Sequence, residues 1–131
     1  MTVENNSGAT CLVLLLRFQG IAVEAQQIIH QYGNNIGITE MLSCAKDLKL
    51  KARAVDSDWL RLTKTTLPAI GQDREGKFFI IGKISDTHVL VQNVAEPRPI
   101  SVSRDEFLNG WNGKLVLMTR RAGLGNFLKA K

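Results

Sequence analysis

The chain has 131 residues, of which 44% are hydrophobic and 22% charged, and this composition predicts one globular domain and excludes a disordered, collagen-like or coiled-coil chain. The formal net charge is +5, and most basic residues follow residue 48. This charge favours an acidic partner, although it also permits nucleic acid or anionic lipid, because net charge sets attraction without specifying what is attracted.

The sequence gives no sign of membrane insertion or export. The longest apolar run, residues 11–16, is much shorter than the roughly 20 residues of a membrane-spanning helix. The first residues lack the basic start and apolar stretch of a secretory signal, so we expect a cytoplasmic domain. Cys11 and Cys44 lie on apolar helical faces, which favours two buried thiols over a disulfide or a metal site.

Three helices are predicted in the first third of the chain, because apolar residues recur there at helical spacing. They cover residues 8–18, 23–32 and 38–48, and Gly20 and Gly33 end the first two. From residue 49 the apolar period changes to two, which predicts a half-buried strand up to Val55 with a basic outer face. Ser57 and Asp58 then predict the start of a short helical turn.

Strands dominate the rest of the chain. Predicted strands cover residues 67–71, 77–84 and 88–92, a region around 100–102, and 114–119. Turns at 73–76 and 85–86 join the first three of these segments as hairpins. A capping box at residues 103–106 opens a short helix over 107–111. The order predicts an α+β fold with N-terminal helices packed on an antiparallel sheet.

Several of these segments together resemble the C39 peptidase family. The resemblance is carried by residues 8–16 (GATCLVLLL), 37–40 (GITE), 48–55 (LKLKARAV), 67–70 (LPAI) and 107–118. It implies a papain-like fold over residues 1–121, at the N-terminus of an ABC transporter, with residues 122–131 starting a linker toward its transmembrane domain. Active members of this family cut a double-glycine leader from a peptide before exporting it.

The family's catalytic residues are missing at the matching positions. The chemistry needs a cysteine thiolate, a histidine that activates it, a residue that orients the histidine and a glutamine that holds the oxyanion. The resemblance places these roles at Ser7, Phe78, Asn93 and Met1. Only Asn93 is able to keep its role, as an orienting amide. The sequence therefore predicts that this domain is not an enzyme and needs neither a cofactor nor a metal.

A peptidase with an unusual mechanism would need Ser7 as its nucleophile and a nearby base to activate it. Neither His30 nor His88 matches the base position. Lys77 is a conceivable Ser-Lys partner, although a turn lysine is ordinarily solvated and unactivated. An active peptidase thus remains an alternative. A domain that only stabilises its transporter is another, whereas nucleic-acid binding is not expected without a recognition motif.

Degenerate C39-like domains occur in type I secretion ABC transporters that export RTX proteins, and the resemblance implies their role here. Such a domain binds the unfolded RTX-type substrate on the cytoplasmic side of the bacterial inner membrane. The rest of the transporter, expected to be a dimeric ATPase, would be the second partner. RTX proteins are acidic, which agrees with a domain of charge +5.

Four aromatic residues are candidates for the substrate-binding surface. Phe78 and Phe79 are neighbours on a predicted strand, so we expect one to point into the core and the other away from it. Phe78 is the more suggestive, because an aromatic ring in place of a polar catalytic group makes a cleft apolar. For Trp59 and Trp111, packing under the short helices is the ordinary alternative to contact with substrate.

Overall fold

The computed structural model describes residues 6–120, without the side chain of Arg120. Its helices are α1 (Ser7–Phe18), α2 (Ala25–Tyr32), α3 (Ile38–Asp47), α4 (Trp59–Leu62) and α5 (Arg104–Gly110). Its strands are β1 (Leu50–Asp56), β2 (Ala69–Asp73), β3 (Phe78–Ile84), β4 (His88–Asn93), β5 (Ile100–Ser103) and β6 (Trp111–Arg120). The predicted α+β class is confirmed.

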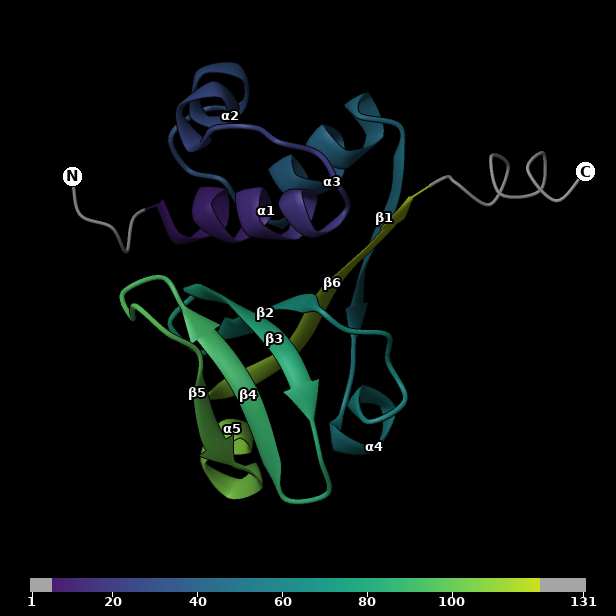
Figure 1. Cartoon of the computed structure of the whole chain (residues 1–131), viewed down its shortest axis with the longest axis vertical. Helices are drawn as coiled ribbons and strands as arrows, with labels where there is room; N and C mark the ends of the chain where they lie inside the picture. The colour runs from purple at the N-terminus through teal and green to yellow at the C-terminus, as the bar shows by residue number, and fades with distance from the viewer. Residues whose placement is uncertain (1–5, 121–131) are drawn as a thin grey trace, which may run out of the picture.

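The six strands form one sheet in the order β1-β6-β2-β3-β4-β5, and every neighbouring pair is antiparallel. Strand β6, the last in sequence, therefore lies between β1 and β2, so that segments far apart in the sequence are neighbours in the sheet. Helices α1 to α3 pack on one side of the sheet. Helices α4 and α5 lie away from them, in the lower part of Figure 1. Within residues 6–120, no helix combines the length and apolar character needed to cross a membrane.

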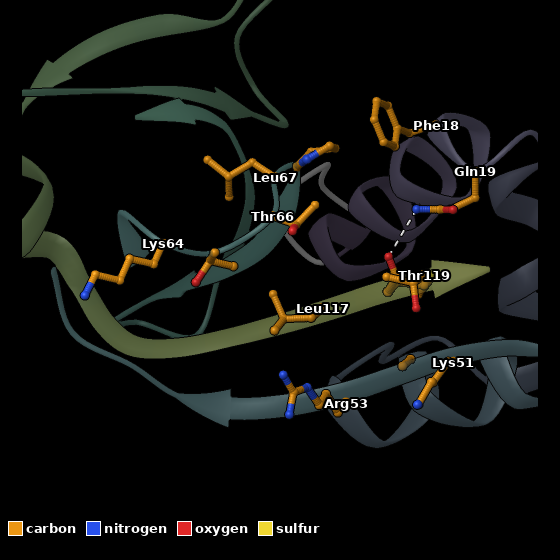
Figure 2. A pocket seen from close by; sticks show the side chains of 13 residues that line it. Phe18, Gln19, Lys51, Arg53, Lys64, Thr66, Leu67, Leu117 and Thr119 are labelled. Carbon is orange, nitrogen blue, oxygen red and sulfur yellow. Dashed lines mark hydrogen bonds between the residues drawn. The ribbon is translucent and has the colours of Figure 1, made fainter. Parts of the chain in front are cut away.

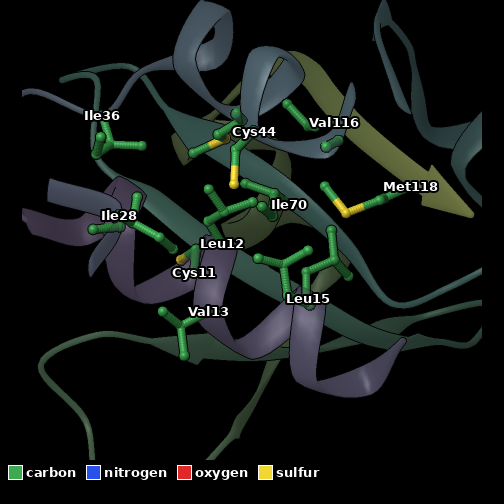
Figure 3. Packing of buried hydrophobic residues seen from close by; sticks show 14 of the residues in the cluster. Cys11, Leu12, Val13, Leu15, Ile28, Ile36, Cys44, Ile70, Val116 and Met118 are labelled. Atoms are coloured by element: carbon green, nitrogen blue, oxygen red, sulfur yellow. The ribbon is translucent and has the colours of Figure 1, made fainter. Parts of the chain in front are cut away.

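The central strands β2 and β3 are largely buried on both faces, so the domain has two hydrophobic cores. The first joins α1 and α3 to the sheet, and Leu12, Leu15 and Cys44 meet Ile70 and Val116 there (Figure 3). The second core, under α4 and α5, is formed by nine buried residues: Leu62, Ala69, Phe79, Ile81, Val89, Val91, Phe107, Trp111 and Leu115. The buried thiols expected at Cys11 and Cys44 are confirmed.

Helix α1 is almost completely enclosed, as its apolar sequence predicts. Gly8 is required by a close approach: a Cβ atom at this position would lie 1.9 Å from the backbone oxygen of Ile36. Helix α2 begins two residues later than predicted because Glu24 is its N-cap, with the Glu24 amide donating to Gln27 Oε1 at 2.8 Å. The N-terminal helices thus hold the loop before α3 against the start of α1.

Several boundaries in the second half differ from the prediction: helix α5, for example, begins at Arg104, three residues earlier than predicted. Strand β2 begins at Ala69, because Pro68 has no amide hydrogen to donate to a neighbouring strand. Trp111 starts β6 instead of ending the short helix, and its indole Nε1 donates to the carbonyl oxygen of Lys114 at 2.9 Å. The proposed linker, residues 122–131, lies outside the described residues and stays a prediction.

Candidate functional site

Ser7, the first residue of α1, contacts the start of β3. Its side chain is buried, with 6% of its surface exposed, and its Oγ accepts a hydrogen bond from the backbone amide of Phe78 at 3.1 Å. In the part of the chain that the structure describes, no side-chain base is hydrogen-bonded to Ser7. The hydroxyl therefore satisfies a buried backbone donor and is not paired with a group that would remove its proton.

Two pockets open on either side of this contact, and Ser7 and Phe78 line both. The larger, of about 410 Å³, lies between the loop at Asn35–Glu40 and Gln72. The smaller, of about 270 Å³, is bounded by Asp73 and the residues that follow β4. The Asn6 side-chain oxygen nearby is buried and lacks a hydrogen-bond partner among residues 6–120. Together the pockets form an interrupted cleft across the N-terminal end of α1.

The structure brings three of the predicted catalytic positions together. Asn93, at the end of β4, lines the smaller pocket with Ser7 and Phe78. Lys77 also lines this pocket, but its side chain is exposed and its Nζ lies 3.8 Å from a Glu75 carboxylate oxygen. The fourth position, Met1, lies outside the residues that the structure describes.

Neither histidine belongs to this cleft. His88 begins β4, about 17 Å along the strand from Asn93, and its Nδ1 lies 2.9 Å from the Thr87 hydroxyl oxygen. His30 is exposed on α2 in a shallow depression lined by glutamines. Between residues 6 and 120 there is also no cluster of three or more side chains that could hold a metal ion.

The family of the domain that contains this cleft follows from a sequence match over nearly the whole chain. Residues 2–123 match the model of the Peptidase C39 family. The chain belongs to this family.

Relatives of this C39 domain include proteins named for toxin translocation. The chain is 36% identical over 124 residues to the alpha-hemolysin translocation ATP-binding protein HlyB of Escherichia coli O157:H7, and 31% identical over 126 residues to the leukotoxin translocation ATP-binding protein LktB of Mannheimia glucosida. The matches cover 91% and 92% of the chain. The chain spans only 18% of the length of each relative.

Solved C39 domains share the fold. The peptidase domain of Streptococcus ComA, a bifunctional ABC transporter, superposes with a TM-score of 0.81 at 14% identity, over 92% of this chain and 95% of that one. A double-glycine motif protease, solved with its leader peptide, gives 0.81 at 18% identity, over 92% and 86%. The peptidase C39-like domain of a Vibrio parahaemolyticus toxin secretion ATP-binding protein gives 0.76 at 16% identity, over 92% and 99%.

The aromatic candidates for substrate binding are mostly internal in the C39 domain. Phe78 and Phe79 point to opposite faces of β3, as expected, but both faces are covered there, so each ring is only 7% exposed and enters a different core. Trp111 is 4% exposed and packs against Phe107. Trp59 is half-buried, with the Arg104 guanidinium 5.3 Å from its ring centre. Their roles in substrate binding stay predictions.

A second hollow of the C39 domain was not predicted from the sequence. It is a groove of about 620 Å³ between the end of α1, strands β1 and β6, and the segment from α4 to β2, and Figure 2 shows Phe18, Lys51, Arg53 and Lys64 around it. The basic alternation in β1 was a visible signal in the sequence, whereas Phe18 was expected on the buried face of its helix and is exposed instead. Their convergence depends on the pairing of β1 with β6, which the sequence alone does not fix.

Proposed function

We propose that this C39 domain is a non-catalytic substrate-docking domain of a type I secretion ABC transporter, and that it binds an unfolded RTX-type protein before export. The observation that carries the proposal is the Ser7–Phe78 contact. At the two positions where the family resemblance expects the nucleophile and its base, a buried hydroxyl accepts a backbone N–H and an aromatic ring belongs to the core.

The relatives support the transport context of the proposal. Their names combine toxin translocation with ATP binding, and this chain corresponds to a small part of their length. We therefore assign ATP hydrolysis and membrane passage to the remaining domains of a dimeric parent transporter. In this arrangement the C39 domain lies on the cytoplasmic side of the bacterial inner membrane, where it meets the substrate before translocation.

Charge supports the choice of an acidic substrate. The chain carries a formal charge of +5, and RTX repeats contain aspartates that bind calcium once the protein is folded. Before calcium binds, these carboxylates are free to interact with a basic domain. Long-range attraction of this kind raises the rate of encounter and favours acidic chains over neutral ones.

The test is a titration of the ¹⁵N-labelled chain with an RTX-repeat fragment, once without calcium and once in its calcium-folded form. Selective amide shifts with the unfolded fragment alone are the expected result. The absence of shifts with both forms, well above ~100 μM where weak binding is detectable, would contradict docking and leave a purely structural role in the transporter.

A peptidase of unusual mechanism is the second candidate, because the family and two of the matched structures are peptidases. It requires a reactive hydroxyl at Ser7. Incubation with a fluorophosphonate probe, followed by intact mass measurement, separates the two candidates. We expect no adduct on the wild-type chain. An adduct that is lost in Ser7→Ala, together with cleavage of a double-glycine leader peptide, would favour the peptidase.

A further inference from the structure

The groove beside Phe18 has a strongly basic lining. Lys51 and Arg53 come from β1, and Lys64 follows α4. Among the residues that the structure describes, no aspartate or glutamate lines this groove. We call it the basic groove, defined by Phe18, Lys51, Arg53, Lys64, Leu117 and Thr119 together with the adjoining residues of these segments.

The pairing of β1 with β6 places the two β1 cations on one face. Lys51 lies opposite Thr119 and Arg53 lies opposite Leu117, and residues that pair directly across two strands project to the same side. Their backbones are two residues apart, about 7 Å along the strand. Lys51 and Arg53 therefore present two positive charges beside a strip of β6 that is partly apolar (Figure 2).

No ion pair within residues 6–120 neutralises these charges. The ion pairs among residues 6–120 join Lys77 to Glu75 and Lys114 to Asp56, and none involves Lys51, Arg53 or Lys64. The positive potential of the basic groove is thus available to an outside anion. Arg and Lys side chains that line a concave surface attract carboxylates more effectively than the same charges spread over a convex one.

An apolar pocket adjoins the basic groove. It has a volume of about 230 Å³ and is lined by Leu14, Leu15, Phe18, Pro68, Ile80 and Gln92. Phe18 and Pro68 line both hollows, so the two lie next to each other beside the Phe18 ring. Phe18 is 64% exposed, which is unusual for a large apolar residue at the end of a mostly buried helix.

We infer that the basic groove and the adjoining apolar pocket bind an unfolded acidic polypeptide. Carboxylates of the bound chain pair with Lys51, Arg53 and Lys64, and an aliphatic side chain enters the pocket beside Phe18. This inference rests on the proposed function and locates its docking surface. RTX repeats place an aspartate two residues before an aliphatic residue, which is about 7 Å in an extended chain.

The inference also explains why this domain would bind the unfolded form of an RTX-type substrate in preference to its calcium-folded form. In a calcium-folded repeat the aspartates ligate calcium and the aliphatic side chains are packed inside. Neither group is then available to the basic groove or to the apolar pocket. The unfolded, calcium-free chain presents both groups at once, so the groove separates the two states without contacting any specific folded surface.

Matched variants of the 131-residue chain test the assignment, with a calcium-free RTX-repeat peptide as the probe. Lys51→Glu/Lys64→Glu is compared with Lys46→Glu/Lys83→Glu, which changes the net charge equally at exposed residues that do not line the groove. Phe18→Ser is compared with Leu60→Ser, since Leu60 is 65% exposed on α4. Calorimetry should show binding weakened about tenfold or more by the groove variants and less than about twofold by the controls.

A second readout uses the wild-type chain and does not depend on the folding of any variant. A spin label on the peptide should broaden the amide signals of Phe18, Lys51 and Lys64. Broadening elsewhere, or equal affinity of groove and control variants, would overturn the groove assignment while leaving docking intact. Failure of the wild-type chain to bind the peptide would overturn docking itself. Groove shifts with phosphatidylglycerol vesicles but not with the peptide would overturn the polypeptide as occupant.

Discussion

Ser7 and Gly8 tie the first turn of α1 to two distant segments. Ser7 Oγ accepts the Phe78 amide, which would otherwise be a buried donor without a partner. Gly8 allows the Ile36 carbonyl to lie against the helix, where a Cβ atom would overlap it. At the level of single residues, Ser7 and Gly8 therefore have a structural use at the start of α1.

Substitution of Gly8 should be costly. Gly8→Ala places a methyl group 1.9 Å from the Ile36 backbone oxygen, and backbone cannot move aside as a flexible side chain can. We expect the free energy of unfolding in urea to fall by about 2 kcal/mol or more. Gly110→Ala is the matched control, because nothing lies within 4 Å of its Cβ and the change should be near neutral or slightly stabilising. Equal stability of both variants would contradict the close packing.

The buried thiols predict a loss of stability in alkali. Burial raises the pKa of Cys11 from 9.0 to about 12, and burial also raises the pKa of Cys44. Since the folded-state values exceed the unfolded ones, this contribution is complete below pH 9 and is lost as the pH rises toward 12. Urea unfolding between pH 7 and 10 should show a falling free energy. Cys11→Ala should flatten this dependence, and an unchanged slope would contradict the assignment.

At the level of elements, β3 joins the two cores. Phe78 and Ile80 point toward α1, while Phe79 and Ile81 point toward the core under α5. Gly71, opposite Phe79 on β2, leaves room for this ring, since a Cβ atom there would lie 2.6 Å from it. The strand is thus buried on both faces, which explains its continuous apolar sequence.

Truncation of either phenylalanine should destabilise the domain strongly. Phe78→Ala and Phe79→Ala each leave a cavity in a separate core, and each should lower the free energy of unfolding by about 3–5 kcal/mol. Leu60→Ala on α4 is the control, because its exposed side chain should contribute little. A small effect at Phe78, measured by urea denaturation, would indicate a surface role for this ring in place of the core role.

The elements could be predicted where the sequence has a clear period. Strand β1 alternates and helix α3 repeats its apolar face, so both were placed within a residue or two. The burial of Phe79 and Trp111 was harder to predict from the sequence, because it depends on how the short helices α4 and α5 pack over the sheet. The meeting of Ser7, Phe78 and Asn93 followed from the family resemblance. The basic groove did not follow from the resemblance, since the residues that line it come from segments far apart in the sequence.

At the scale of the whole molecule, net charge and shape act together. A formal charge of +5 attracts acidic chains in any orientation, whereas the basic groove gives three of the cations a concave setting next to an apolar pocket. In the proposed docking role, the first property governs encounter and the second governs where an acidic chain stays bound.

Binding should therefore weaken with salt but persist in part. Raising sodium chloride from about 50 mM to about 500 mM shortens the Debye length severalfold, so the charge-dependent part of the affinity should fall. A peptide with asparagine in place of aspartate should bind more weakly and show little salt dependence. Calorimetry at several salt concentrations checks both points, and an affinity independent of salt would contradict the electrostatic contribution.

Native mass spectrometry of the chain mixed with a calcium-free RTX-repeat fragment tests the central claim most directly, because one spectrum reports both complex formation and the integrity of the substrate. The account predicts a complex whose two components keep their full masses after prolonged incubation, and its loss when calcium folds the fragment. Cleavage products of the fragment, or a spectrum with no complex at any concentration, would contradict non-catalytic docking.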